Sequence, residues 1–327
     1  MNRWKIALVV PVYNRPNELK DLLESLCQQQ EKDFALVVVE DGSTIDSEAL
    51  CEEYSKRLNL TYLKQANTGP AVARNRGVDA VGDTSEFVLF VDSDCTLPPD
   101  YIAKAYTWLA TTPRVDLWGG PDAWDANFSP IQKAISYAMT SPFSTGGIRG
   151  GSEAADKFYP RTFNMGVRTE AFHAVGGFAN LRYGEDVDLS MRLIEAGYQS
   201  HLSTDLYLFH KRRTSWTSFF RQVAHSGAAR YELTKRHPGT LKLVHVLPSL
   251  AMFVALLVLL IPLTWVQYVV LGGGAALYAL VLFAGALRSF RSFGLALRSM
   301  WACAIMLLGY GWGLALAWMV RKPSQEK

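Results

Sequence analysis

The stretch Lys5-Ile-Ala-Leu-Val-Val-Pro-Val-Tyr13 has no polar side chain between its two ends. A strand with one solvated face would alternate apolar and polar residues, so this unbroken run predicts a strand buried on both faces. Shorter runs of the same kind follow at Phe34–Val39, Leu60–Leu63 and Phe87–Val91. We therefore expect these segments to be strands of one parallel sheet.

The segments between the runs carry apolar residues at helical spacing. Those expected on one helix face are Leu19, Leu22, Leu23 and Leu26, and then Leu50, Tyr54 and Leu58. Pro16 suits the first turn of the first helix, and another helix is expected from Thr68-Gly69. Strands that alternate with helices predict an α/β fold, in which helices cover both faces of a mostly parallel sheet.

Acidic residues directly follow two of the predicted strands. Asp41 lies in Glu40-Asp41-Gly42-Ser43, and Asp92 begins Asp92-Ser93-Asp94. The carboxyl ends of parallel strands meet at one edge of the sheet, and ligands bind beyond that edge. We therefore expect Asp41 and Asp92 to share one crevice.

The pair Asp92 and Asp94 is a candidate metal site, because both carboxylates can face one hard divalent cation. Mg²⁺ or Mn²⁺ prefers oxygen ligands and often bridges to a substrate diphosphate. His210, after the strand-like Leu206–Phe209, is a candidate third ligand. The alternative is a solvated turn or a helix cap before Pro98.

Two further residues could bind a nucleotide. The carboxylate of Asp41 can accept a hydrogen bond from the N–H of a base, and Gly42 lets the backbone come close. The alternative for Asp41 is a cap on the next helix. Arg74 can reach a phosphate or anchor the acidic crevice, and its alternative is a surface residue on an exposed helix.

Gly184-Glu185-Asp186 comes before a segment with helical spacing. A carboxylate there is either a general base or a helix cap. The cations of His210-Lys211-Arg212-Arg213, Arg212 among them, can hold a diphosphate, and the alternative is charge at a membrane surface.

The composition changes sharply toward the C-terminus. Hydrophobic residues make up 49% of the 327 residues and charged residues 19%, but residues 246–287 and 299–320 contain no Asp, Glu, Lys or Arg. This excludes disorder, collagen and a disulfide scaffold, and it nearly excludes a purely soluble enzyme. The net charge of +3 is too small to argue for a nucleic-acid partner. The four cysteines have no paired spacing and predict reduced thiols in the cytosol or, for Cys303, a residue that fills space within the membrane. The N-terminus does not resemble a signal peptide.

These patterns predict a domain at 1–213, a basic amphipathic interfacial region at 214–242, a membrane domain at 243–322 and a tail at 323–327. The expected spans are 246–266, 267–287 and 300–320. The basic loop with Arg288, Arg291 and Arg298 is expected in the cytosol by the positive-inside rule. The alternative to the third span is a re-entrant segment broken at Gly309-Tyr-Gly-Trp-Gly313. A second amphipathic helix, near 124–139, is either interfacial or part of the core.

The separate motifs occur together and in one order. They are Pro11-Val-Tyr-Asn14, Glu40-Asp-Gly-Ser43, Ala73-Arg-Asn-Arg-Gly77, Asp92-Ser-Asp94 and Gly184-Glu-Asp186. Over about residues 5–212 the chain resembles the family-2 glycosyltransferases with the GT-A fold. The resemblance implies a nucleotide-diphosphate sugar as donor and Mg²⁺ or Mn²⁺ as cofactor.

The resemblance also implies a role for each matching residue. Asp186, or alternatively Glu185, would be the catalytic base. Asp94 would be the main metal ligand, with Asp92 and His210 beside it. The residues expected to bind the nucleotide sugar are Pro11, Tyr13, Asp41, Arg74, Asp92, Ser93, Gly166 and Arg212. The Gly-rich stretch Ser141–Gly151 is expected to be a loop over the acceptor.

The implied reaction is a single displacement that inverts the anomeric carbon. Processive synthases of this family carry Gln-x-x-Arg-Trp after the base, and here Gln222 is followed by Val-Ala-His. This favours the addition of one sugar to a polyprenyl-diphosphate-linked saccharide, from the cytosolic face of the cytoplasmic membrane. The alternatives are a polyprenyl-phosphate sugar synthase, a non-catalytic membrane scaffold that kept the fold, and a nucleotidyltransferase.

Overall fold

The structure is a computed structural model that describes residues 4–112, 114–123, 128–145, 158–260 and 264–320. The chain divides into two compact units. The first contains Met1–Asp125 and Gly151–Lys211, and the second contains Ala126–Gly150 and Arg212–Lys327. The segment 126–150, which the sequence analysis placed inside one domain of residues 1–213, therefore belongs with the second unit.

The first unit contains two sheets. Their strands are β1 (Trp4–Val12), β2 (Phe34–Asp41), β3 (Leu60–Gln65), β4 (Ser85–Phe90), β5 (Cys95–Thr96), β6 (Leu117–Gly119), β7 (Asp122–Ala123), β8 (Met165–Arg168), β9 (Ser200–Leu202) and β10 (Leu208–His210). The larger sheet has the order β3-β2-β1-β4-β8-β6-β9, and the smaller one β5-β10-β7. In the larger sheet β8 runs antiparallel to β4 and β6, and the other pairs are parallel. The expected mostly parallel α/β sheet is thus confirmed.

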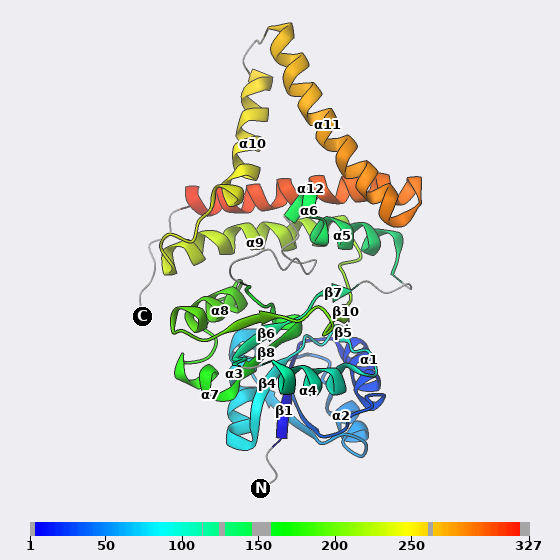
Figure 1. Cartoon of the computed structure of the whole chain (residues 1–327), viewed down its shortest axis with the longest axis vertical. Helices are drawn as coiled ribbons and strands as arrows, with labels where there is room; N and C mark the ends of the chain where they lie inside the picture. Colours follow the sequence, from blue (N-terminus) through cyan, green and yellow to red (C-terminus); the bar gives the residue numbers. More distant parts are fainter. Residues whose placement is uncertain (1–3, 113, 124–127, 146–157, 261–263, 321–327) are drawn as a thin grey trace. The chain divides into compact units, whose positions relative to one another are not determined.

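Helices of the first unit cover both faces of the larger sheet (Figure 1). They are α1 (Pro16–Cys27), α2 (Glu48–Tyr54), α3 (Pro70–Val81), α4 (Tyr101–Thr111), α7 (Thr169–Ala174) and α8 (Glu185–Glu195), with two 3₁₀ turns, η1 (Gly82–Thr84) and η2 (Thr162–Asn164). Alternate residues of β1 point to opposite faces. Leu8 packs toward α1, α2 and α4, whereas Val9 packs toward α3, α7 and α8. This two-sided burial explains the unbroken apolar run.

Two helix boundaries differ from the expectation. The helix expected to carry Leu50, Tyr54 and Leu58 ends at Tyr54, and Leu58 is buried in the turn that follows. A turn can bury a leucine as well as a helix can, so the spacing did not reveal the boundary. In the second unit, the helix expected from Trp124 begins only at Pro130, and Trp124 lies outside the described residues.

The second unit is helical over its described residues. Its helices are α5 (Pro130–Thr140), α6 (Pro142–Thr145), α9 (Trp216–Arg236), α10 (Leu243–Leu260), α11 (Trp265–Phe290) and α12 (Phe293–Met319). One apolar core joins α5, α9, α11 and α12, and Ile135, Phe219 and Met306 belong to it. Phe219 is fully buried there, so this residue of α9 is a core residue. The interfacial role of the 214–242 region stays a prediction.

Two of the described helices, α11 and α12, are long and apolar enough to cross a membrane, and α10 is a shorter apolar helix. The expected turn near residues 262–267 falls partly outside the described residues, and α11 begins at Trp265. The break considered at Gly309–Gly313 is absent, because α12 is one continuous helix over that stretch. These glycines instead allow close packing, since an added Cβ at Gly313 would lie 1.9 Å from the carbonyl oxygen of Ala224 in α9.

Candidate active site

The loop after β2 uses Asp41 to hold the turn that starts α3. One carboxylate oxygen of Asp41 accepts from the backbone N–H of Thr68 at 2.9 Å, and the other accepts from that of Gly69 at 2.9 Å. Gly42 has φ +70°, and an added Cβ would lie 2.4 Å from the backbone nitrogen of Asn67. Glycine is required there because the two loops touch. Contact between Asp41 and a base stays a prediction.

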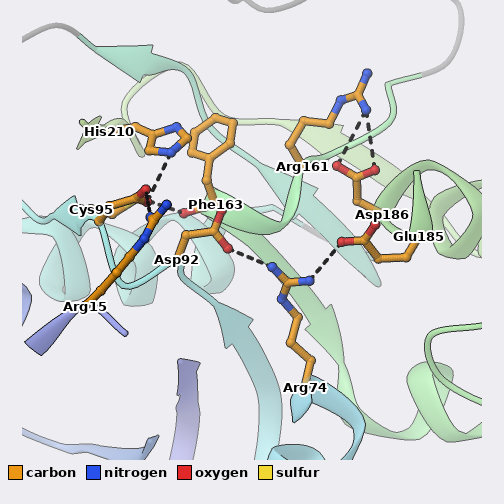
Figure 2. Close-up of polar contacts among 10 residues, drawn as sticks. Arg15, Arg74, Asp92, Cys95, Arg161, Phe163, Glu185, Asp186 and His210 are labelled. Atoms are coloured by element: carbon orange, nitrogen blue, oxygen red, sulfur yellow. Dashed lines mark hydrogen bonds and ion pairs between the residues drawn. The ribbon is translucent and has the colours of Figure 1, made fainter. Parts of the chain in front are cut away.

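Arg74 on α3 connects the carboxylates that follow β4 with those that begin α8. Its side chain is only 4% exposed. One guanidinium nitrogen donates to Asp92 Oδ1 at 2.8 Å, and another donates to Glu185 Oε1 at 3.0 Å (Figure 2). Arg74 is therefore not the surface residue considered as its alternative, because it is buried and pairs with two carboxylates. Contact with a phosphate stays a prediction.

Glu185 and Asp186 begin α8 and point to different partners (Figure 2). Glu185 faces Arg74, and burial, together with the charge of Asp186, raises the pKa of Glu185 to about 6 although Arg74 acts against this. Asp186 accepts from the N–H of Val187 at 2.7 Å, and Arg161 lies at 3.4 and 3.5 Å from its two oxygens. Glu185 is thus bound in a buried ion pair, whereas Asp186 has only long contacts to its cation. Asp186 is the better placed of the two to accept a proton.

Asp94 and His210 meet although 116 positions separate them in the sequence. His210 Nε2 lies 3.2 Å from Asp94 Oδ1, and His210 Nδ1 lies 3.7 Å from Asp122 Oδ2. The ring of Phe163 stacks on the imidazole with centroids 5.2 Å apart. Burial lowers the pKa of His210, but the carboxylates of Asp94 and Asp122 outweigh burial and raise it to about 10.

The smaller sheet brings these residues together. In β10, His210 is paired with Cys95 of β5, and Leu208 is paired with Asp122 of β7. Asp122 was missed by the sequence analysis, because nothing near it in the sequence signals a site. The pairing of strands that lie far apart in the chain creates this contact.

Asp92 and Asp94 offer carboxylate oxygens, which suit a hard divalent cation, and the imidazole of His210 could join them once it has lost its proton. The thiol of Cys95 lies with Asp94 and His210, all ligand atoms being within 4.8 Å of one another. Burial raises the pKa of this thiol well above its ordinary value, and sulfur is not among the oxygen ligands that Mg²⁺ or Mn²⁺ prefers. Arg15 forms an ion pair with Asp94 and already supplies one positive charge there.

The remaining candidates are spread over both units. Tyr13 is 50% exposed just after β1, Pro11 lies within that strand, and Ser93 is buried between the two aspartates. Gly166 lies in β8, where an added Cβ would be 2.0 Å from the ring of the buried Trp118. Packing therefore requires glycine at position 166, and a role near the donor sugar stays a prediction.

Arg212 belongs to the second unit and is buried there. One of its guanidinium nitrogens lies 3.3 Å from Met139 Sδ on α5, and its carbonyl accepts from Gln132 at 3.0 Å. Its contact with a diphosphate stays a prediction. The stretch Ser141–Gly151 is described only as far as residue 145, and the expected loop over the acceptor lies largely outside the described residues.

Residues 7–176, just over half of the chain, match the family described as glycosyl transferase family 2. The chain belongs to this family. The glycosyltransferase is 26% identical over 280 residues to the succinoglycan biosynthesis protein ExoA of Rhizobium meliloti strain 1021, covering 82% of each chain. It is 29% identical over 245 residues to the pre-mycofactocin glycosyltransferase of Mycobacterium tuberculosis strain H37Rv, covering 71% of this chain and 48% of that one.

Among solved structures, the glycosyltransferase is similar to the mannosyltransferase PcManGT from Pyrobaculum calidifontis, solved in complex with GDP-Man and Mn²⁺. The TM-score is 0.63, the identity is 18%, and the match covers 94% of this chain and 88% of that one. At this identity the likeness shows the fold alone. It confirms the GT-A fold that the motifs implied.

The buried position of Arg74 gives a direct prediction for the stability of this glycosyltransferase. Arg74→Ala leaves Glu185 buried without its cation, and breaking such a pair costs about 3–5 kcal/mol. We expect the free energy of unfolding to fall by about 3 kcal/mol, because Asp92 is partly exposed and keeps solvent contact. Denaturant unfolding of the protein in detergent measures the loss.

Arg76→Ala is the matched control, because Arg76 lies on the same helix but is exposed. It should change stability by no more than about 0.5 kcal/mol. Equal effects of the two substitutions would show that the Arg74 ion pairs do not stabilise the fold.

Proposed function

We propose that this glycosyltransferase moves one sugar from a nucleotide-diphosphate sugar to a lipid-linked saccharide, with inversion at the anomeric carbon. The observation that carries the proposal is the chain of contacts from Asp92 through Arg74 to Glu185, next to Asp186. Asp92, a proposed cation ligand, and Glu185, the neighbour of the proposed base, bind the same buried arginine, which supports one connected site.

The chemistry assigned to the chain's own residues is a single displacement. Asp186 accepts the proton of an acceptor hydroxyl as that oxygen bonds to the anomeric carbon, and the bond from this carbon to the diphosphate oxygen breaks. Asp92, Asp94 and His210 would hold Mg²⁺ or Mn²⁺, which supplies charge stabilisation to the leaving diphosphate. Arg74 keeps Glu185 and Asp92 in place, and Arg161 orients Asp186.

The proposed acceptor and setting draw on the relatives. ExoA is named for succinoglycan biosynthesis, and GgaA of Bacillus subtilis strain 168, 28% identical over 116 residues, for minor teichoic acid biosynthesis. Both names concern the biosynthesis of surface glycans. With the apolar C-terminal helices, they favour a polyprenyl-diphosphate-linked saccharide as acceptor, at the cytosolic face of the cytoplasmic membrane.

The test is a screen of donors. Detergent-purified protein is incubated with Mn²⁺ and a native lipid extract, and GDP-mannose, UDP-glucose, UDP-galactose and UDP-N-acetylglucosamine are offered one at a time. Mass spectrometry should find a lipid-linked saccharide that has gained one hexose or N-acetylhexosamine. NMR of the product should show an anomeric configuration opposite to that of the donor.

Other outcomes would replace the proposal with its alternatives. A sugar carried directly on polyprenyl phosphate would identify a polyprenyl-phosphate sugar synthase. Nucleotide released in an amount equal to the protein, with no glycosylated lipid, would favour the non-catalytic scaffold. Retention of the donor's configuration would contradict the single displacement.

A further inference from the structure

Helix α12 has the length and composition of a membrane span, but its surroundings in the second unit differ from those of a span. One face of its 27 residues is buried in the core with α5 and α9, where Ala302, Cys303 and Met306 are enclosed. The opposite face is exposed and apolar. Its residues recur at helical spacing and are Phe293, Leu297, Trp301, Leu308, Trp312 and Met319.

Helix α9 runs alongside α12 in the same direction. An added Cβ at Gly309 would lie 2.4 Å from Val223, and one at Gly227 would lie 2.1 Å from the carbonyl oxygen of Tyr310. Further along, the rings of Tyr231 and Trp318 are 6.1 Å apart. The contact thus follows α9 from about Val223 to Tyr231 and has no room for lipid between the helices.

This contact matters because α9 is not a membrane helix. It carries Arg221, Arg230, Glu232, Lys235 and Arg236, and Arg221, Lys235 and Arg236 are exposed. Charged side chains inside a bilayer are costly. If α12 crossed the membrane, α9 would have to enter with it or the packed core would have to separate. The first outcome would bury charged side chains of α9 in lipid. The second would break the close contacts at Gly227, Gly309 and Gly313.

The parts of α10 and α11 that lie farthest from α12 differ from α9, because their exposed residues are mostly apolar. Each helix contacts the rest of the unit about a third of its length from one end. Ser249 on α10 donates to the Gly311 carbonyl at 2.9 Å, and the carbonyl of Leu282 on α11 accepts from Tyr137 at 3.2 Å. Beyond these anchors the two helices leave α12 and approach each other at their far ends (Figure 1). The exposed apolar residues on these distal parts include Phe253, Leu256, Leu260, Trp265, Val269, Val270 and Leu277.

We propose that α10 and α11 cross the bilayer as a hairpin, while α12 lies flat in the cytosolic interface with its apolar face toward the acyl chains. The 26 residues of α11 reach about 39 Å, more than the roughly 30 Å hydrocarbon core. The 18 residues of α10 reach about 27 Å, at the short end of the range of about 17–25 residues found for spanning helices. Trp301 and Trp312 suit the headgroup level, where amphipathic aromatic side chains concentrate. The basic surface of α9 beside them attracts anionic lipid.

The arrangement also resolves a conflict in charge. A third span would carry Arg321 and Lys322 across the membrane, against the positive-inside rule. With two crossings, these residues and the arginines at 288, 291 and 298 all stay on the cytosolic side. The proposal concerns the position of the helices and does not depend on the sugar or the acceptor.

The test measures depth in the membrane. Single cysteines replace Leu297, Leu308 and Met319, all exposed on the apolar face of α12, and carry an environment-sensitive fluorophore. Cys27→Ser serves as background, because the other native cysteines are buried. The full chain is placed in vesicles of equal parts phosphatidylcholine and phosphatidylglycerol that contain lipids brominated at different acyl depths. Labels at Val269, Leu277 and Leu287 on α11 are the matched controls.

The three α12 labels should be quenched alike and best by shallow bromines, although about 33 Å of helix separates the first from the last. The α11 labels should differ, with Leu277 the deepest. A label at Leu308 deeper than those at Leu297 and Met319 would show that α12 crosses the membrane. No quenching at any α12 position would show that its apolar face binds another protein surface or a second copy of the chain. Either result overturns the proposal.

Discussion

Replacing Asp186 with Asn is expected to lower the rate of sugar transfer by about 10²–10⁴-fold, the usual contribution of a positioned base. The amide keeps the size of the side chain but cannot accept the acceptor's proton. The proposed donor site lies at the strand ends, so donor affinity should change little. Single-turnover transfer and donor titration, measured on the same preparation, separate the two effects.

Glu195→Gln provides a control for this substitution. It also neutralises a carboxylate on α8, but at the exposed far end of the helix, and transfer should stay near that of the unchanged protein. If Asp186→Asn transferred sugar at a near-normal rate, the role of base would move to Glu185 or the displacement mechanism would be wrong. Glu185→Gln would then decide, with the reservation that Glu185 also pairs with Arg74 and its loss must be checked for unfolding.

The second large effect is expected at Asp94. Asp94→Ala removes a carboxylate from the proposed cation site, and a cation of this kind supplies several kcal/mol of charge stabilisation in the reaction. Transfer should therefore fall by about 10³-fold or more, and the increase in donor affinity caused by Mn²⁺ should vanish. Calorimetric titration with donor, with and without Mn²⁺, measures the second effect directly.

Asp83→Ala tests whether the loss at Asp94 is specific. Asp83 is exposed in the 3₁₀ turn before β4, whereas Asp94 follows the carboxyl end of that strand. Its removal should leave the dependence on Mn²⁺ unchanged. Full transfer by the unchanged protein in excess chelator would disprove the cation site at Asp92, Asp94 and His210 together.

Much of the fold was predictable because its signals are local. The unbroken run in β1 requires burial on both sides, and the acidic residues at 41 and 92 mark where strands end. The start of α8 at Glu185 also followed from neighbouring residues. Boundaries were less certain, since Leu58 is buried just outside α2 by a turn that leaves no periodic pattern.

The neighbours of the candidate site were harder to predict, because they come from distant parts of the chain. Asp122 reaches His210 through the register of β7 and β10, and Arg161 reaches Asp186 from the segment before β8. Neither residue has a distinctive local pattern. Gly166 shows a second reason why a role could not be predicted from the sequence. The buried Trp118 requires glycine at this position whether or not a sugar approaches it.

The division of the chain into two units has a consequence for how such enzymes can be cut and recombined. The first unit is interrupted by 126–150, so the chain passes from one unit to the other three times. A single splice near residue 211 would therefore leave α5 with the wrong partner and expose the core faces of α9 and α12. Exchanging the membrane-associated part between relatives requires two grafts made together. We expect segments 126–150 and 212–327 to have been exchanged together, and not singly, wherever related enzymes have recombined.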